Sequence, residues 1–449
     1  MGLDADYSLS RAYLAQGWPT FVVIGADGII RFHGFDSDRN LSALRRCLEE
    51  LAPKEAAGSK PVLVGGIAMP AETLACRQAR RDRSPRLAFD GAGNPNVVYY
   101  SNREGTNAVY WRRCNQRGET LGEQRLDAVS AESYAPDCAF DSNGALWAVW
   151  CGRRQGMYDI FVESLRPGDR PTPQRLTLSD DDAMSPKLAT GPGGVVTVTY
   201  YKWAMLWGSS RDRNIFARTY DPARQMWSAE VEVSPHVPEV EDHTDPDVVF
   251  DAQGQPWVAW SYDYHRQLYK KPVDAEQPTI FAARLSSNAV SPPLLVGATG
   301  AFRDAIDLFP SAAVDGQGAL WCAWDCSEPR RCIRLARLEP AGDKFSLIST
   351  FGREPEICST PELSAAGQDL LLLAWSQRAG AGLWRGRVIL LKAGQPLADT
   401  TLTESAEVLY PQAQRAPDGQ YWVAYEKADA KGSEVALRNI TTELGGVRR

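Results

Sequence analysis

The chain has 449 residues, of which 44% are hydrophobic and 23% charged, and its formal net charge at pH 7 is −7. This acidic balance argues against a general nucleic-acid surface, because binding phosphates requires clustered lysine and arginine. No apolar run approaches the ~20 residues of a membrane-spanning helix, so no membrane partner is expected. The first ten residues lack the basic start and apolar core of a signal peptide. We therefore expect a cytoplasmic protein, or a periplasmic or secreted one if a leader precedes this sequence.

Residues 1–56 differ from all that follow and predict a small α/β unit. Apolar strands are expected at 17–24 and 29–32, and leucines spaced three and four apart predict a helix over 41–51. This pattern resembles the C-terminal half of a thioredoxin- or peroxiredoxin-type domain. The half that carries the redox cysteines in that family is absent, and Cys47 falls within the helix, which argues against redox catalysis. Two interpretations stay open: a truncated remnant, which we favour, or a docking piece for the rest of the chain, a protein partner or a second copy.

A linker at 53–60 leads into seven repeats, and residues 57–449 are predicted to form one domain. Each repeat has a proline that is followed fourteen residues later by an aromatic residue. The pairs are Pro85 and Tyr99, Pro136 and Trp150, Pro186 and Tyr200, Pro246 and Trp260, Pro310 and Trp324, Pro361 and Trp375, and Pro411 and Tyr425. Successive prolines are 51, 50, 60, 64, 51 and 50 residues apart, which is typical of four-stranded propeller blades.

The fourth repeat shows the anatomy of one predicted blade. Residues 247–250 form a short strand, 251–254 a turn of sequence Asp-Ala-Gln-Gly, and 257–260 the returning strand. Glycine adopts a positive φ at little cost, and the aspartate side chain can bond the turn backbone. Two further apolar segments complete the blade, so the sequence predicts an all-β, seven-bladed β-propeller.

The two ends of the repeat array predict how the ring closes. The seventh repeat stops after its third strand, near Ile440, whereas 61–65 (PVLVG) matches the fourth-strand segment 293–297 (PLLVG). We therefore expect an N-terminal strand to complete the last blade and remove an exposed edge. Between this strand and the first repeat lie Arg77, Arg80, Arg81 and Arg83, which we interpret as a solvated surface cluster.

The repeats resemble sialidase-like, or neuraminidase-repeat, propellers, in which a D-x-x-G turn precedes a strand that bears tryptophan. The similarity covers nearly all of 57–449. The aspartate-box form S-x-D-x-G-x-T-W is met at no turn. The active site of that family therefore cannot be transferred to this chain.

Polar residues follow each repeat proline and are expected to form an inner ring. They are Arg86, Asp137, Lys187, Asp247, Ser311, Glu362 and Gln412. One interpretation is that their charges pair and hold the blades in register. The alternatives are that Arg86, Lys187 and Glu362 bind substrate, or that Asp137 and Asp247 with Glu362 hold Ca²⁺ through oxygen ligands. No cofactor is certain, and no cysteine or histidine pattern has zinc spacing.

Two long loops break the sevenfold symmetry and point to a binding site near the third to fifth blades. They span 201–213 and 261–279 and should overhang the end of the channel at which the first strand of each blade begins and the second strand ends, called here the mouth. Aromatic side chains that could wall a pocket are Trp203, Trp207, Tyr262, Tyr264 and Tyr269. Cationic side chains that could hold an anion are Arg211, Arg213, Lys270 and Lys271.

Histidines converge on the same sector. His243 precedes the first strand of the fourth blade and His265 follows its second strand, with Asp242, Asp245 and Tyr264 nearby. We expect these rim residues to act as a general base, an acid and an orienting carboxylate, with the carboxylates favouring protonated histidine and the loops contributing little to stability. The spelling Asp242-His243-x-x-Pro246 with Tyr264-His265 also resembles ulvan-lyase-type propellers, where histidine and tyrosine serve proton abstraction from a uronic acid.

These residues predict a hydrolase that acts on a small or carbohydrate-like anionic substrate, such as an ester, phosphoester or glycoside. A polysaccharide lyase is the first alternative. A binding module or scaffold without chemistry is the second, because propellers host all three functions on one frame.

Overall fold

The structure is a computed structural model that describes residues 20–24, 30–35, 81–127, 130, 132–154, 156–177, 181–205, 211–234, 241–264, 277–286, 289–299, 307–326, 331–352, 355–380, 382–402, 405–429 and 432–445. The chain divides into two compact units, Met1–Arg77 and Gln78–Arg449. In the first unit, β1 (Thr20–Ile24) pairs antiparallel with β2 (Ile30–Phe35), in agreement with the two predicted strands. The predicted helix at 41–51, Cys47 and the predicted closing strand at 61–65 lie outside the described residues. The thioredoxin-like resemblance therefore stays an expectation.

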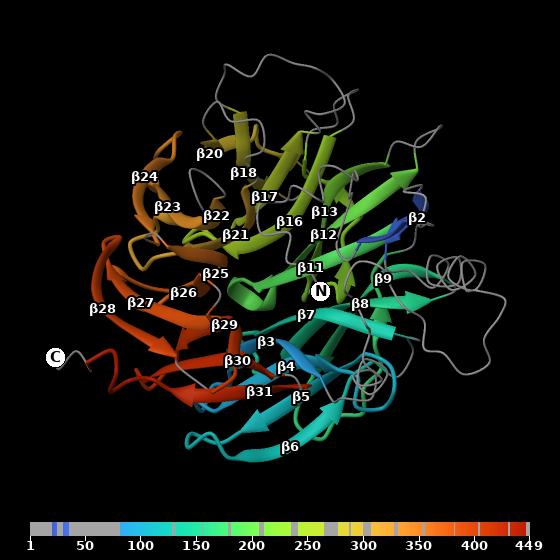
Figure 1. Cartoon of the computed structure of the whole chain (residues 1–449), viewed down its shortest axis with the longest axis horizontal. Coiled ribbons are helices and arrows are strands. Elements are labelled where there is room, and N and C mark those ends of the chain that lie inside the picture. Colours follow the sequence, from blue (N-terminus) through green and yellow to red (C-terminus); the bar gives the residue numbers. More distant parts are fainter. Residues whose placement is uncertain are drawn as a thin grey trace. The chain divides into compact units, whose positions relative to one another are not determined.

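The second unit is a seven-bladed β-propeller of antiparallel sheets, which follow one another around a centre from the blue β3 to the red β31 (Figure 1). Blade one contains β3 (Asp82–Phe89), β4 (Pro95–Ser101), β5 (Ala108–Cys114) and β6 (Thr120–Arg125). Blade two contains β7 (Glu132–Phe140), β8 (Leu146–Arg154), β9 (Met157–Leu165) and β10 (Gln174–Arg175). Blade three contains β11 (Asp182–Thr190), the 3₁₀ helix η1 (Pro192–Gly194), β12 (Val196–Met205), β13 (Arg211–Asp221), β14 (Met226–Trp227) and β15 (Val231–Glu232).

The remaining blades repeat this order. Blade four contains β16 (Glu241–Phe250), β17 (Pro256–Tyr264), β18 (Gln277–Ser286), β19 (Ala289–Val290) and β20 (Leu294–Thr299). Blade five contains β21 (Asp307–Val314), β22 (Leu320–Cys326), β23 (Cys332–Leu338) and β24 (Ser346–Phe351). Blade six contains β25 (Glu356–Ala365), β26 (Leu370–Ala379), β27 (Arg385–Lys392) and β28 (Gln395–Leu402). Blade seven contains β29 (Glu407–Arg415), β30 (Tyr421–Asp429) and β31 (Gly432–Asn439).

The turn between the first and second strands is fixed by its aspartate. In blade four, Asp251 Oδ1 accepts the backbone N–H groups of Gln253 and Gln255 at 2.9 and 2.8 Å, and Gly254 adopts a φ of 75°. Asp251 Oδ2 also accepts the indole N–H of Trp257 at 3.1 Å. Blades two and five repeat this arrangement with Asp141 and Asp315. One carboxylate therefore shapes the turn and anchors the tryptophan of the strand that follows.

The hydrophobic core lies between neighbouring blades. Each of the seven junctions in the described propeller has one buried cluster to which both blades contribute. The aromatic residue fourteen positions after each proline belongs to this core, because all seven are at most 3% exposed. The fourteen-residue spacing of the repeat therefore runs from a proline on the channel side of the blade to an aromatic residue in the core between two blades.

Blades one and seven close the ring through direct contacts. Arg81 forms a parallel β-bridge with Ser433, and Ser433 Oγ donates to the carbonyl of Asp82 at 3.0 Å. Arg112 donates to the carbonyl of Val435 at 3.1 Å, and a buried cluster spans the two blades. The blue first blade and the red seventh blade accordingly lie side by side (Figure 1). Within the described residues no helix is long and apolar enough to cross a membrane.

Candidate functional site

Each innermost strand carries a bulge near the mouth. The residue before the repeat proline has a positive φ in all seven blades, although none is glycine, and the strand register shifts at this point. These residues are Ser84, Ala135, Ser185, Asp245, Phe309, Thr360 and Tyr410, with φ between 48° and 54°. Such a conformation costs roughly 1–2 kcal/mol for an L-residue. Bulges re-aim side chains and are frequent beside functional sites, so they indicate a candidate functional site at the mouth.

The predicted inner ring is present, and its charges pair across the channel. Arg86 of blade one forms an ion pair with Glu362 of blade six, and its Nε lies 3.8 Å from Asp137 Oδ1. Lys187 of blade three places its Nζ 3.7 Å from Glu362 Oε1. Because blades one, three and six are not neighbours, these side chains meet over the centre of the ring.

The same ring also links three pairs of neighbouring blades. Asp137 Oδ2 accepts the backbone N–H of Leu188 at 2.9 Å, and Asp247 Oδ2 accepts that of Ala312 at 2.7 Å. Ser311 accepts the N–H of Leu363 in the same way. The expected pairing of the ring charges is therefore present, whereas their role in holding the blades in register stays a prediction. Among the described residues, no group of three or more His, Cys, Asp or Glu is placed to hold a metal ion, and the Ca²⁺ site at Asp137 and Asp247 stays an expectation.

The pKa values of two carboxyl groups of the ring are shifted in opposite directions. Burial raises the pKa of Asp247 to about 6, although Lys187 opposes this shift. Burial would also raise the pKa of Glu362, but Arg86 and Lys187 outweigh it and hold that pKa below its ordinary value. The ring therefore combines a carboxyl with a raised pKa and one with a lowered pKa.

Trp203 and Arg213 pack together on blade three, and the charge of Arg213 acts on Asp245 of blade four. Trp203 and Arg213 are register partners on β12 and β13, and the guanidinium carbon lies 4.7 Å from the indole centroid. Burial raises the pKa of Asp245 to about 6, while a hydrogen bond from Thr244 and the charges of Arg213 and Lys187 lower it. Asp245 is thus a half-buried carboxyl that exchanges its proton near pH 6, next to two cationic side chains.

His243 is part of the core rather than of an exposed rim. It is 1% exposed, and its Nδ1 accepts the indole N–H of Trp260 at 2.9 Å. An indole nitrogen can only donate, so neutral His243 carries its proton on Nε2, and protonation of Nδ1 would break this bond. The expectation that His243 lies on an exposed rim and contributes little to stability is therefore wrong. Tyr262, its register partner, packs against it with ring centroids 5.0 Å apart.

Several predicted residues of this sector fall outside the description. His265, Trp207, Tyr269, Lys270 and Lys271 lie outside the described residues. Arg211, Asp242 and Tyr264 belong to β13, β16 and β17, but their side chains are likewise outside the described part. The predicted convergence of His265 with His243 therefore stays a prediction.

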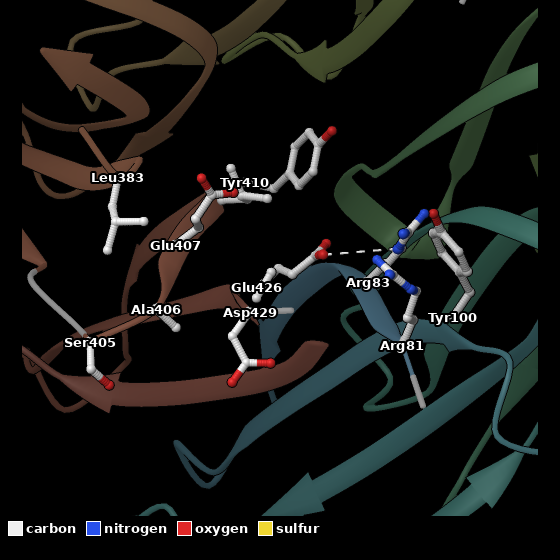
Figure 2. Close-up of a pocket in the computed structure, with 12 residues that line it drawn as sticks. Arg81, Arg83, Tyr100, Leu383, Ser405, Ala406, Glu407, Tyr410, Glu426 and Asp429 are labelled. Atoms are coloured by element: carbon white, nitrogen blue, oxygen red, sulfur yellow. Dashed lines mark ion pairs between the residues drawn. The ribbon is translucent and has the colours of Figure 1, made fainter. Parts of the chain in front are cut away.

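A cavity of about 570 Å³ lies elsewhere on the mouth, between blades seven and one (Figure 2). Arg83 and Tyr100 of blade one and Tyr410 and Glu426 of blade seven contribute to its lining. The Arg83 side chain is 39% exposed, in line with the expected solvated cluster, but its Nε is buried and lies 3.9 Å from Glu426 Oε1. Sequence reasoning missed this site because Arg83 and Glu426 come from opposite ends of the repeat array and no local motif connects them.

The fold and the mouth define a seven-bladed β-propeller whose innermost strands carry paired charges. No family model matches the sequence, and no curated protein matches it. Among solved structures, the chain is similar to the polysaccharide lyase Uly1 at 12% identity, with 86% of this chain and 94% of that chain covered and a TM-score of 0.51. It is also similar to the intramolecular trans-sialidase from Ruminococcus gnavus (11% identity, 82% and 96% covered, TM-score 0.43) and to the α-L-arabinanase of Penicillium chrysogenum (12% identity, 70% and 94% covered, TM-score 0.47). At these identities the similarity concerns the fold, and the first of the three supports the propeller.

Proposed function

We propose that the protein is a hydrolase of an anionic glycan and that it acts at the mouth beside blades three and four. The observation that carries this proposal is the carboxyl of Asp245, whose pKa burial raises to about 6 beside Arg213 and Lys187. A carboxyl with this pKa is protonated for part of the time near neutral pH and can act as a general acid. The two cations supply the attraction for a negatively charged substrate.

The site residues take separate roles in this proposal. Protonated Asp245 gives its proton to the oxygen of the leaving group, as one carboxyl does in most glycoside hydrolases, and a water molecule then adds to the sugar carbon that this oxygen leaves and releases its own proton to solvent. Glu362, which Arg86 and Lys187 keep ionised, provides the negative charge that stabilises a developing cation on the sugar. Trp203 and Tyr262 offer flat faces for sugar rings. Asp242, Tyr264, His265, Trp207 and Arg211 remain sequence-based candidates for further contacts.

A lyase is the second candidate, and the pair of His243 and Tyr262 favours it. The two rings lie 5.0 Å apart, and His243 is fixed in the tautomer with its proton on Nε2. A lyase removes the proton next to a uronate carboxylate, a step that requires a base and a group that neutralises the carboxylate. Tyr262 would serve the first need and Arg213 the second.

A panel of uronate-bearing polysaccharides and aryl glycosides separates these possibilities. New reducing ends without ultraviolet absorbance of an unsaturated uronate indicate hydrolysis, whereas both together indicate a lyase. A binding module would bind the glycan without turnover and would release no product.

The decisive variant is Asp245→Asn, because asparagine tolerates the positive φ of this position. We expect kcat to fall by ~10²-fold or more, together with loss of the wild-type decline in kcat/KM above about pH 6. Asp343→Asn, in an exposed turn of blade five, serves as the matched control and should keep both. Wild-type turnover and an unchanged pH profile in Asp245→Asn would refute the assignment of Asp245.

A further inference from the structure

The cavity between blades seven and one contains two buried polar atoms that the described protein leaves without hydrogen-bond partners. Glu426 is 3% exposed and its Oε2 accepts no hydrogen bond from a described residue. The same holds for the donor Nε of Arg83, which is 3.9 Å from Glu426 Oε1 and therefore too far for a hydrogen bond. Figure 2 shows the two side chains facing one another from β30 and β3. Buried polar atoms are nearly always paired in native proteins, so this couple suggests a ligand.

The chemistry of the couple restricts what can bind. A donor and an acceptor lie side by side, and a hydroxyl group can donate to one and accept from the other. An anion such as phosphate would satisfy Arg83 but would be repelled by Glu426, Glu407 and Asp429, which also line the cavity. A cation would satisfy Glu426 and leave Arg83 unpaired.

The walls of the cavity favour a ring-shaped polyol over a small alcohol. Tyr410 is 44% exposed, and Tyr100 contributes a second aromatic side chain to the lining. Aromatic faces pack against the C–H face of a sugar ring while its hydroxyls reach polar groups. The volume of about 570 Å³ accommodates a ligand of that size. Burial raises the pKa of Glu426 above its ordinary value, although Arg83 opposes this shift.

From these contacts we infer that the cavity is a binding site for an uncharged sugar unit, whose hydroxyls bridge Glu426 Oε2 and Arg83 Nε. The site opens on the mouth, since Glu407 begins β29 and Asp429 ends β30. It does not depend on the chemistry proposed for Asp245, because binding here requires no proton transfer in blade four.

Calorimetric titration of the whole protein with neutral hexoses, pentoses and 6-deoxyhexoses tests the inference. We expect saturable binding of at least one sugar to the wild type. Glu426→Gln should weaken it roughly tenfold, because a charge-assisted hydrogen bond becomes a neutral one. Tyr410→Ala, at an exposed position, should weaken it as well without disturbing the core. Glu434→Gln, on β31 and not among the residues that line the cavity, is the control and should bind as the wild type does.

Three results would overturn the inference. They are equal sugar affinity in the wild type and Glu426→Gln, no binding of any sugar in the panel, and preferential binding of inorganic phosphate or of a diamine at the same site. Asp245→Asn should keep the sugar affinity of this cavity. Failure of this inference therefore leaves the proposed hydrolysis intact, and failure of the hydrolysis leaves the sugar site to be judged by titration alone.

Discussion

Replacing Asp247 by asparagine should stabilise the propeller above pH 6 and have little effect near pH 4. Burial raises the pKa of Asp247 from 3.8 to about 6. Because the folded-state pKa is above the unfolded one, the contribution of the protonated carboxyl is fully present below about pH 4 and is lost as pH rises through about 6. A shift of about two pKa units corresponds to about 3 kcal/mol.

The asparagine side chain would avoid this loss, since it cannot ionise. Its amide oxygen can still accept the N–H of Ala312, which Asp247 accepts at 2.7 Å. We therefore expect the free energy of unfolding of Asp247→Asn to exceed that of the wild type by up to about 3 kcal/mol at about pH 8 and to match it near pH 4. Urea unfolding followed by tryptophan fluorescence at the two pH values measures the difference.

Glu362→Gln is the control of opposite sign in the same ring. Arg86 and Lys187 hold the pKa of Glu362 in the folded protein below its ordinary value. The charge of Glu362 therefore stabilises the folded state at any pH above the pKa of the unfolded state, and this contribution is lost as pH falls through the pKa of the folded state. Glu362→Gln should therefore lower stability at about pH 8, where Asp247→Asn raises it. If Asp247→Asn were no more stable than the wild type at either pH, ionised Asp247 would be well solvated and the account of a desolvated channel would be wrong.

Two further predictions concern the core and the domain boundary. His243→Ala should lower the free energy of unfolding by about 1–3 kcal/mol, because the indole N–H of Trp260 loses its acceptor. His243→Asn should recover part of this loss. Wild-type stability of His243→Ala in urea unfolding would contradict the buried position. Deletion of residues 1–56 should leave the unfolding midpoint unchanged. If 61–65 completes blade seven, deletion through residue 65 should lower the midpoint and promote association, which light scattering detects. Equal midpoints of the two deletion variants would argue against the closing strand.

Short-range chemistry made the architecture of the propeller predictable. The turn of blade four is set by Asp251 and Gly254, which act within six residues of chain, and the alternation of strands follows from the local pattern of apolar residues. The proline and the buried aromatic residue fourteen positions later mark the channel side and the core side of every blade. Seven copies of this unit predicted the ring and the inner positions of Arg86 and Lys187.

The same local signals could not predict the state of the site residues. His243 occupies a predicted position, yet its burial and its bond to Trp260 depend on how β16 packs against β17. The positive φ of Asp245 could not be read from the sequence either, since a residue before proline normally adopts an extended conformation.

Only the tertiary structure decided which charges meet and how strongly they hold their protons. Arg86 and Glu362 are 276 residues apart in the chain and pair across the channel, and Arg83 and Glu426 meet where the two ends of the array close. A pKa depends on the burial of a group and on the charges within a few ångströms of it, whatever their distance along the chain. The sequence alone therefore determined the blades and the residues available at the mouth, whereas ring closure determined their partners and protonation.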